Sequence, residues 1–66
     1  MEFGKNLKEL RKEKGLTQTE LASFLCTTQD SISLWELGKS FPDIPTLIKI
    51  CKFFDVSTDF ILGLDN

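Results

Sequence analysis

The sequence predicts an all-α fold in the form of a compact domain of five short helices. Its 66 residues allow a single domain, residues 1–66, with a modest core. Apolar residues recur at the three- and four-residue spacing of helix faces, and the period-two pattern of strands is missing. Candidate caps and glycines mark the beginning and the end of each helical segment.

The first two helices are predicted from their apolar faces and their end signals. Residues 2–15, "EFGKNLKELRKEKG", place apolar side chains on one face and finish at Gly15, which suits a helix C-terminus. In residues 17–26, "TQTELASFLC", Thr17 followed by Glu20 has the pattern of a capping box, which marks a helix start. The expected inward residues of these two helices are Phe3, Leu7, Leu10, Leu21, Ala22 and Leu25.

A third helix is predicted in residues 27–39, "TTQDSISLWELGK". Thr28 can cap its N-terminus and Gly38 can end it. Ile32 and Trp35 are expected to face inward, with Trp35 near the centre of a core that all the helices share. None of these short helices buries enough surface to be stable alone.

Two more helices complete the prediction. Asp43 can cap a fourth helix that tolerates Pro45 in its first turn. Ser57 can cap a short last helix that ends at Gly63. The expected apolar residues are Ile44, Leu47, Ile48, Cys51 and Phe54 in the fourth helix, and Phe60, Ile61 and Leu62 in the fifth.

Charge and composition exclude several classes of function. A net charge of -2 and a pI of about 4.9 argue against strong nonspecific binding to nucleic acid. Residues 1–15 hold five basic and three acidic side chains, so the acidity comes from the later part of the chain. Without histidine, and with Cys26 and Cys51 each expected as a packing residue, no metal site, cofactor, disulfide framework or enzyme chemistry is predicted.

Residues 18–37 combine a short helix, a tight turn and a second helix, which is the arrangement of a helix-turn-helix. With this segment, "LKELRKEKGLTQTELA", "TTQDSISLWELGKSFPDIPTLIKI" and "VSTDFILG" resemble the helix-turn-helix repressors of the Cro and phage-repressor family, also called XRE-like or lambda-repressor-like. The resemblance runs from Phe3 to Gly63. It implies a five-helix domain that binds double-stranded DNA, usually as a homodimer on a palindromic operator, and that regulates transcription, with repression as the expected outcome.

The resemblance implies that the helix at about residues 28–37 enters the major groove. Gln29 stands where phage repressors use a Gln on adenine, a base whose edge matches both groups of the amide. Asp30, Ser33 and Leu34 complete the expected base contacts. For Asp30, the favoured interpretation is a favourable interaction with the helix dipole, and the second is that its carboxylate accepts a hydrogen bond from cytosine N4. Leu34 meets either a thymine methyl group or a protein.

Other roles follow from the same resemblance. The expected phosphate contacts are Gln18, Thr28, Lys39 and Ser40. Arg11 and Glu36 match a partly buried ion pair that joins the first helix to the third. Phe60 or Ile61 is expected to pack in the core. The remaining apolar surface, with Leu64, is the candidate dimer surface.

The sequence departs from the family at the turn and in its exposed apolar residues. Cys26 replaces the glycine usual at the turn, so either it carries the strain of a left-handed conformation or the turn geometry differs.

Phe24, Leu34 and Leu37 are candidates for one apolar patch. Together with the acidic pI, such a patch would suit a protein-interaction module, and antitoxin-type repressors share this fold. We expect a cytoplasmic protein with no membrane segment and no small-molecule ligand.

Overall fold

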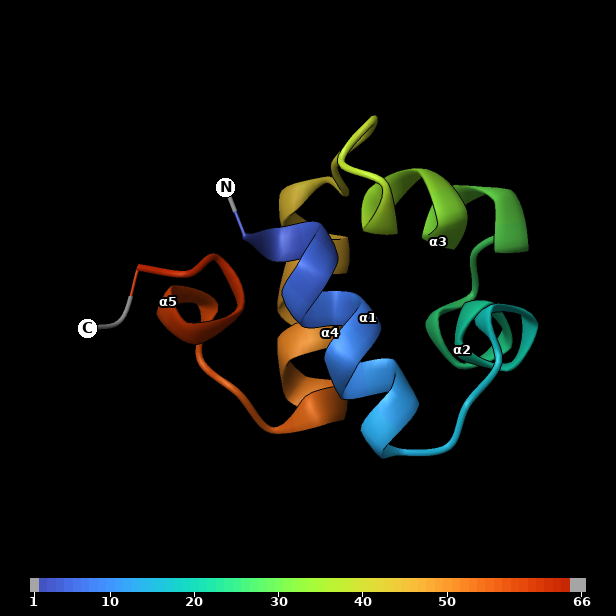
Figure 1. The fold of residues 1–66 in the computed structure, drawn as a ribbon, viewed down its shortest axis with the longest axis horizontal. Coiled ribbons are helices and arrows are strands. Elements are labelled where there is room, and N and C mark those ends of the chain that lie inside the picture. Colours follow the sequence, from blue (N-terminus) through green and yellow to red (C-terminus); the bar gives the residue numbers. More distant parts are fainter. Residues whose placement is uncertain (1, 65–66) are drawn as a thin grey trace.

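The computed structural model describes residues 2–64, and this part of the chain forms five helices joined by short loops (Figure 1). They are α1 (Phe3–Glu13), α2 (Gln18–Leu25), α3 (Gln29–Glu36), α4 (Ile44–Phe54) and α5 (Thr58–Ile61). The predicted all-α fold with five helices is confirmed. Within residues 2–64, every helix is too short or too polar to cross a membrane.

The helices pack around α1 and α4, which cross at the centre of the view in Figure 1. In that view α2 and α3 lie on one side of the molecule and α5 on the other. α1 packs against both α3 and α5, α2 packs against α3 and α4, and α4 packs against α5. The first turns of α1 lie between the end of α3, which meets Gly4, and α5, whose Phe60 and Ile61 carbonyl oxygens accept from Asn6 Nδ2.

Side-chain caps begin four of the helices. The Thr17 hydroxyl accepts a hydrogen bond from the N–H of Glu20, and the Glu20 carboxylate accepts one from the N–H of Thr17, so the predicted capping box is confirmed. The side chains of Thr28, Asp43 and Ser57 each accept one hydrogen bond from the N–H of the third residue of α3, α4 and α5, so these caps are also as predicted. Each cap satisfies an N–H group that the helix itself leaves without a partner.

One continuous core holds the five helices together. Its buried residues are Phe3, Leu7, Leu21, Ala22, Leu25, Ile32, Trp35, Leu47, Ile50, Cys51, Phe54 and Ile61. The predicted inward face of α4 is partly wrong, because Ile44 is 65% exposed and Ile48 is 45% exposed, whereas Ile50 is fully buried. The buried stripe of α4 therefore runs through Leu47, Ile50, Cys51 and Phe54 at helical spacing.

Two helices end at a residue with positive φ that is not glycine. Cys26 follows α2 with φ 57°, and Asp55 follows α4 with φ 56°. Cys26 therefore adopts the left-handed conformation considered from its sequence position. Its side chain is exposed, so the expectation that it packs among apolar neighbours is wrong, whereas Cys51 is a core residue. Burial raises the pKa of the Cys51 thiol, which makes that group less reactive.

Candidate nucleic-acid interface

The helix-turn-helix consists of α2, a three-residue turn and α3. In the turn, the N–H groups of Cys26 and Thr27 donate to the carbonyl oxygens of Ser23 and Ala22 at 3.3 and 2.9 Å, which satisfies the end of α2. Thr28 then caps α3. On the inner face of α3, Ile32 and Trp35 are buried in the core, so the orientation of this helix is fixed from behind.

The outer face of α3 carries the residues predicted to meet bases. Gln29 and Asp30 are exposed in the first turn, and Leu34 is exposed one turn later. Ser33 is only half-buried and remains accessible. The structure therefore places all four on accessible surface of one helix, and their contact with DNA stays a prediction.

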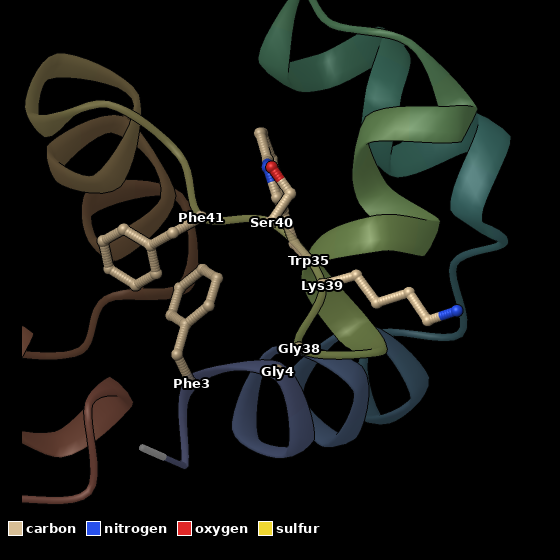
Figure 2. Close-up of a pocket in the computed structure, with 7 residues that line it drawn as sticks. All are labelled: Phe3, Gly4, Trp35, Gly38, Lys39, Ser40 and Phe41. Carbon is tan, nitrogen blue, oxygen red and sulfur yellow. The ribbon is translucent and has the colours of Figure 1, made fainter.

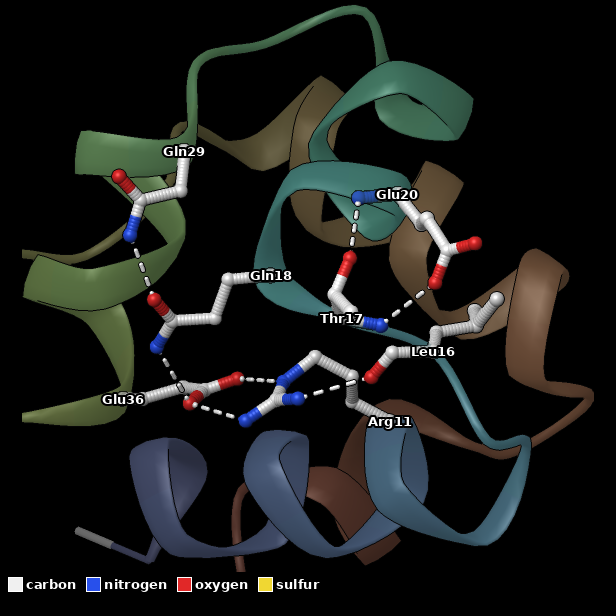
Figure 3. A network of polar contacts seen from close by, with 7 residues as sticks. All are labelled: Arg11, Leu16, Thr17, Gln18, Glu20, Gln29 and Glu36. Atoms are coloured by element: carbon white, nitrogen blue, oxygen red, sulfur yellow. Dashed lines mark hydrogen bonds and ion pairs between the residues drawn. The ribbon is translucent and has the colours of Figure 1, made fainter.

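A chain of hydrogen bonds runs from this outer face into the protein (Figure 3). Gln29 Nε2 donates to Gln18 Oε1 at 2.6 Å, and Gln18 Nε2 donates to Glu36 Oε1 at 3.0 Å. Arg11 donates to both carboxylate oxygens of Glu36, from Nε at 2.6 Å and from Nη2 at 3.1 Å. Arg11 Nη1 also donates to the carbonyl oxygen of Leu16 at 2.8 Å. The chain thus connects α1, α2 and both ends of α3.

The carboxylate at the inner end sets the direction of this chain. An ionised carboxylate only accepts hydrogen bonds, so Gln18 must turn its NH₂ group towards Glu36. The carbonyl oxygen of Gln18 then faces Gln29, which must in turn present its own NH₂ group. Oε1 of Gln29 makes no hydrogen bond to the described residues and remains available. The amide of Gln29 is therefore oriented before any ligand arrives.

The ion pair at the inner end is nearly removed from solvent. The side chains of Arg11 and Glu36 are 10% and 4% exposed. The hydrogen bond to Glu36 raises the pKa of the Arg11 guanidinium above its ordinary value, against the opposing effect of burial. The Arg11 guanidinium therefore stays charged, and its contact with Glu36 links α1 to the last residue of α3.

The residues predicted to contact phosphate lie around α3. Thr28 is exposed at its N-terminus, and Lys39 and Ser40 are exposed just after its C-terminus. Gln18, one of the expected phosphate contacts, joins Gln29 to Glu36 in the structure, and its contact with phosphate stays a prediction. Lys39 is the cation closest in sequence to α3, because the remaining basic residues belong to α1, its C-terminal cap and α4.

A hollow of about 370 Å³ lies between the first turn of α1 and the loop after α3, and sequence reasoning missed it. It is lined by Phe3, Gly4, Trp35, Gly38, Lys39, Ser40 and Phe41. Figure 2 shows the rings of Phe3 and Phe41 together on one side, with the Lys39 side chain extending away from them. Among residues 2–64, no three carboxylates or thiols gather in a way that could hold a metal ion.

The exposed apolar residues are spread over several helices and loops. Ile61 is fully buried and takes the core position expected of Phe60 or Ile61, so it does not belong to the candidate dimer surface, while Phe60 and Leu64 are exposed. Phe24 does not simply extend the apolar surface of α3, because its ring packs on Phe53 of α4 with 5.2 Å between centroids. Leu34 and Leu37 remain exposed on α3 and just after it.

Comparisons with known proteins agree with this geometry. Residues 7–61 match the family model HTH_3, described as helix-turn-helix. The chain is 45% identical over 63 residues to the HTH-type transcriptional activator BcrR of Enterococcus faecalis, across 96% of this chain and 31% of BcrR. It is 42% identical over 66 residues to the HTH-type transcriptional regulator ImmR of Bacillus subtilis (strain 168), across 100% of this chain and 52% of ImmR. The chain thus spans no more than about half the length of these curated relatives.

Among solved structures, the P22 c2 repressor protein in complex with a synthetic operator superposes with a TM-score of 0.90. The sequence identity is 25%, and the match covers 98% of both chains. The family match covers more than half of the chain and includes α2, the turn and α3. The chain therefore belongs to the HTH_3 family of helix-turn-helix transcriptional regulators, the XRE-like or lambda-repressor-like family that includes phage repressors.

Proposed function

We propose that this chain binds a specific DNA sequence by inserting α3 into the major groove, and that it represses transcription from the bound site. The observation that carries this proposal is the orientation of Gln29. Its amide projects from the exposed start of α3, and Gln18 fixes its direction. A side chain oriented before binding loses less conformational entropy when it pairs with a base.

The orientation of Gln29 matches adenine. Oε1 of Gln29 is available to accept from adenine N6, and the second N–H on Nε2 is available to donate to N7. Asp30 and Leu34 then meet the neighbouring bases, with Asp30 accepting from cytosine N4 and Leu34 against a thymine methyl group. Ser33 completes the base-facing set.

Phosphate contacts come mainly from neutral groups. Thr28, Ser40 and the N-terminus of α2 offer hydroxyl and N–H donors, and Lys39 supplies a charge. With so few cations around α3, we expect about 2–4 neutralised phosphates per subunit and a correspondingly shallow dependence of affinity on salt. Affinity per subunit is then modest.

A homodimer would raise the modest affinity of a single subunit for DNA. The exposed apolar residues in this part of the fold are Phe60 in α5, Leu64 after it, and Ile44 and Ile48 on α4. α4 and α5 pack together. Burying this surface between two copies is favourable, and a two-fold dimer presents two α3 helices to successive major grooves about 34–36 Å apart. The operator is then palindromic.

Repression requires nothing beyond DNA binding, because the bound domain blocks other proteins from the same groove. Activation needs a further surface for a second protein. The similarity to the activator BcrR covers 31% of that protein, so it does not extend to most of its chain. The superposition on the P22 c2 repressor covers 98% of both chains and supports repression more directly.

A second function is favoured by one observation. Asp30, Leu34 and Leu37 place an acidic and two apolar side chains on the exposed side of α3 and its C-cap, a surface that would also suit a protein. Selection of bound sequences from a random duplex pool separates the two functions, with the oligomeric state measured in parallel. Enrichment of a palindrome containing adenine supports DNA reading, whereas no binding even at low salt rules it out.

A further inference from the structure

The first turn of α1 meets the C-terminal end of α3 at Gly4, which is buried. A methyl group on its Cα would lie 2.5 Å from the carbonyl oxygen of Trp35 and 2.8 Å from that of Glu36. Both distances are far shorter than a van der Waals contact, so no side chain fits between the two helices. Figure 2 shows this meeting point, where α1 passes the end of α3.

Backbone conformation does not explain a glycine at this position. Gly15 and Gly38 have φ of 70° and 75°, a region that favours glycine, and a side chain on either would meet open space. Gly4 instead lies in the first turn of α1 and is not among the glycines with positive φ. Close approach of the two backbones therefore accounts for Gly4.

The contact at Gly4 and the ion pair hold the same end of α3. Gly4 and Arg11 are two helical turns apart on one face of α1, and both are buried. Gly4 faces the backbone carbonyl oxygens of Trp35 and Glu36, which leave no space for a Cβ atom, while Arg11 binds the Glu36 carboxylate. Two separate points on α1 thus fix the C-terminal end of α3 in position and direction.

We propose that Gly4 is a positioning residue for base recognition, because its lack of a side chain sets the distance between α1 and α3. This inference rests on the proposed DNA-binding function. Gln29 lies at the other end of α3, about 10 Å from Glu36 along the helix axis. A tilt that relieves a clash at Glu36 would displace the amide of Gln29, and recognition sites require placement within about 0.5 Å.

The test is Gly4→Ala, with two matched controls. Lys5→Ala changes an exposed side chain in the same turn of α1, and Ile50→Val removes a methyl group from a buried residue of α4. Each variant is measured for affinity to the selected duplex and to the same duplex changed at the adenine opposite Gln29. The orientation of α3 relative to α1 is measured by NMR residual dipolar couplings without DNA.

We expect Gly4→Ala to lower the ratio of the two affinities by about tenfold, the value of one lost bidentate base contact. The α3 couplings should change while those within α1 stay constant. Lys5→Ala and Ile50→Val should keep both properties at temperatures where each is folded. If Gly4→Ala is too unstable, the comparison is repeated in an Asp55→Gly background, which relieves left-handed strain at the end of α4.

An unchanged affinity ratio, or a loss equal to that of Ile50→Val, overturns the inference. Unchanged α3 couplings in Gly4→Ala overturn it as well, even if affinity falls. If the unmodified protein selects no duplex, the proposed DNA-binding function fails. The dipolar couplings then still decide whether Gly4 sets the placement of α3.

Discussion

Arg11 Nε lies 2.6 Å from Glu36 Oε2, and both side chains are almost completely buried. This ion pair connects the last turn of α1 to the end of the helix proposed to read DNA. Glu36 also accepts the hydrogen bond from Gln18 that starts the chain leading to Gln29. A single carboxylate therefore serves both the stability of the fold and the orientation of the proposed recognition amide.

Replacing Glu36 should be strongly destabilising. Glu36→Ala leaves the Arg11 guanidinium buried without its partner, and we expect a loss of roughly 3–5 kcal/mol in the free energy of unfolding. Urea unfolding followed by circular dichroism measures it. Glu9→Ala, which removes an exposed glutamate from α1, is the control and should change stability by less than about 0.5 kcal/mol. Equal stability of the two variants would refute a structural role for the pair.

Gln18 should affect base discrimination without touching a base. Gln29→Ala is expected to lose about 1–3 kcal/mol of preference for adenine over other bases. Gln18→Ala should lose part of the same preference, because Gln29 is then no longer oriented. Binding to duplexes that differ at one base pair measures both effects.

The double variant provides the control for this coupling. If Gln18 acts through Gln29, Gln18→Ala should have little further effect on the adenine preference once Gln29 is alanine. Fully additive losses would show instead that Gln18 contacts DNA separately.

The sequence predicts well the features that depend on local chemistry. The sequence predicts all four caps, at Thr17, Thr28, Asp43 and Ser57. A hydroxyl or carboxylate side chain just before an apolar helical segment commonly serves as its N-cap. The left-handed conformation of Cys26 was considered because a glycine is usual there. Such features depend on a few neighbouring residues.

Features that depend on packing between helices were less predictable. Apolar residues occupy several sides of α4, so its sequence did not reveal that Ile50 is buried while Ile44 and Ile48 are exposed. Gly4 has no positive φ to mark it, and only the meeting of α1 and α3 explains it. The part of Gln18 in orienting Gln29 likewise depends on the distance between two helices.

Cys26→Gly should stabilise the protein. Cys26 has φ 57° and an exposed thiol, so glycine removes steric strain without loss of packing. The expected net gain is about 0.5–1 kcal/mol, after the greater freedom of glycine in the unfolded chain is subtracted. Cys26→Ala keeps the Cβ atom and should give no such gain. A stability loss in the glycine variant, measured by urea unfolding, would contradict this account of the turn.

Asp43 should make stability sensitive to acid. Hydrogen bonds from Thr46, through its side chain and its backbone N–H, lower the pKa of the Asp43 carboxyl from its ordinary 3.8. A group with a lowered folded pKa stabilises the protein above its unfolded pKa, and the contribution disappears as pH falls through the folded value. We therefore expect stability to decrease as pH falls below about 4.

Asp43→Asn separates this titration from the cap itself, because asparagine caps a helix about as well as aspartate but does not ionise. Urea unfolding of both proteins between neutral pH and acid should give a smaller acid-dependent loss for the variant. Parallel curves for the two proteins would assign the loss to other carboxylates.

The apolar surface at the end of α5 should control assembly. Phe60 and Phe24 are both exposed phenylalanines, but Phe60 belongs to the proposed dimer surface while Phe24 packs on Phe53. Phe60→Glu places a charge in the proposed dimer surface and should shift the protein to monomer, which sedimentation equilibrium detects. The DNA affinity of this variant should fall when the dimer is lost, since each subunit alone makes few phosphate contacts. Phe24→Glu should leave the dimer intact, and equal loss of dimer in both variants would place the two-fold interface elsewhere.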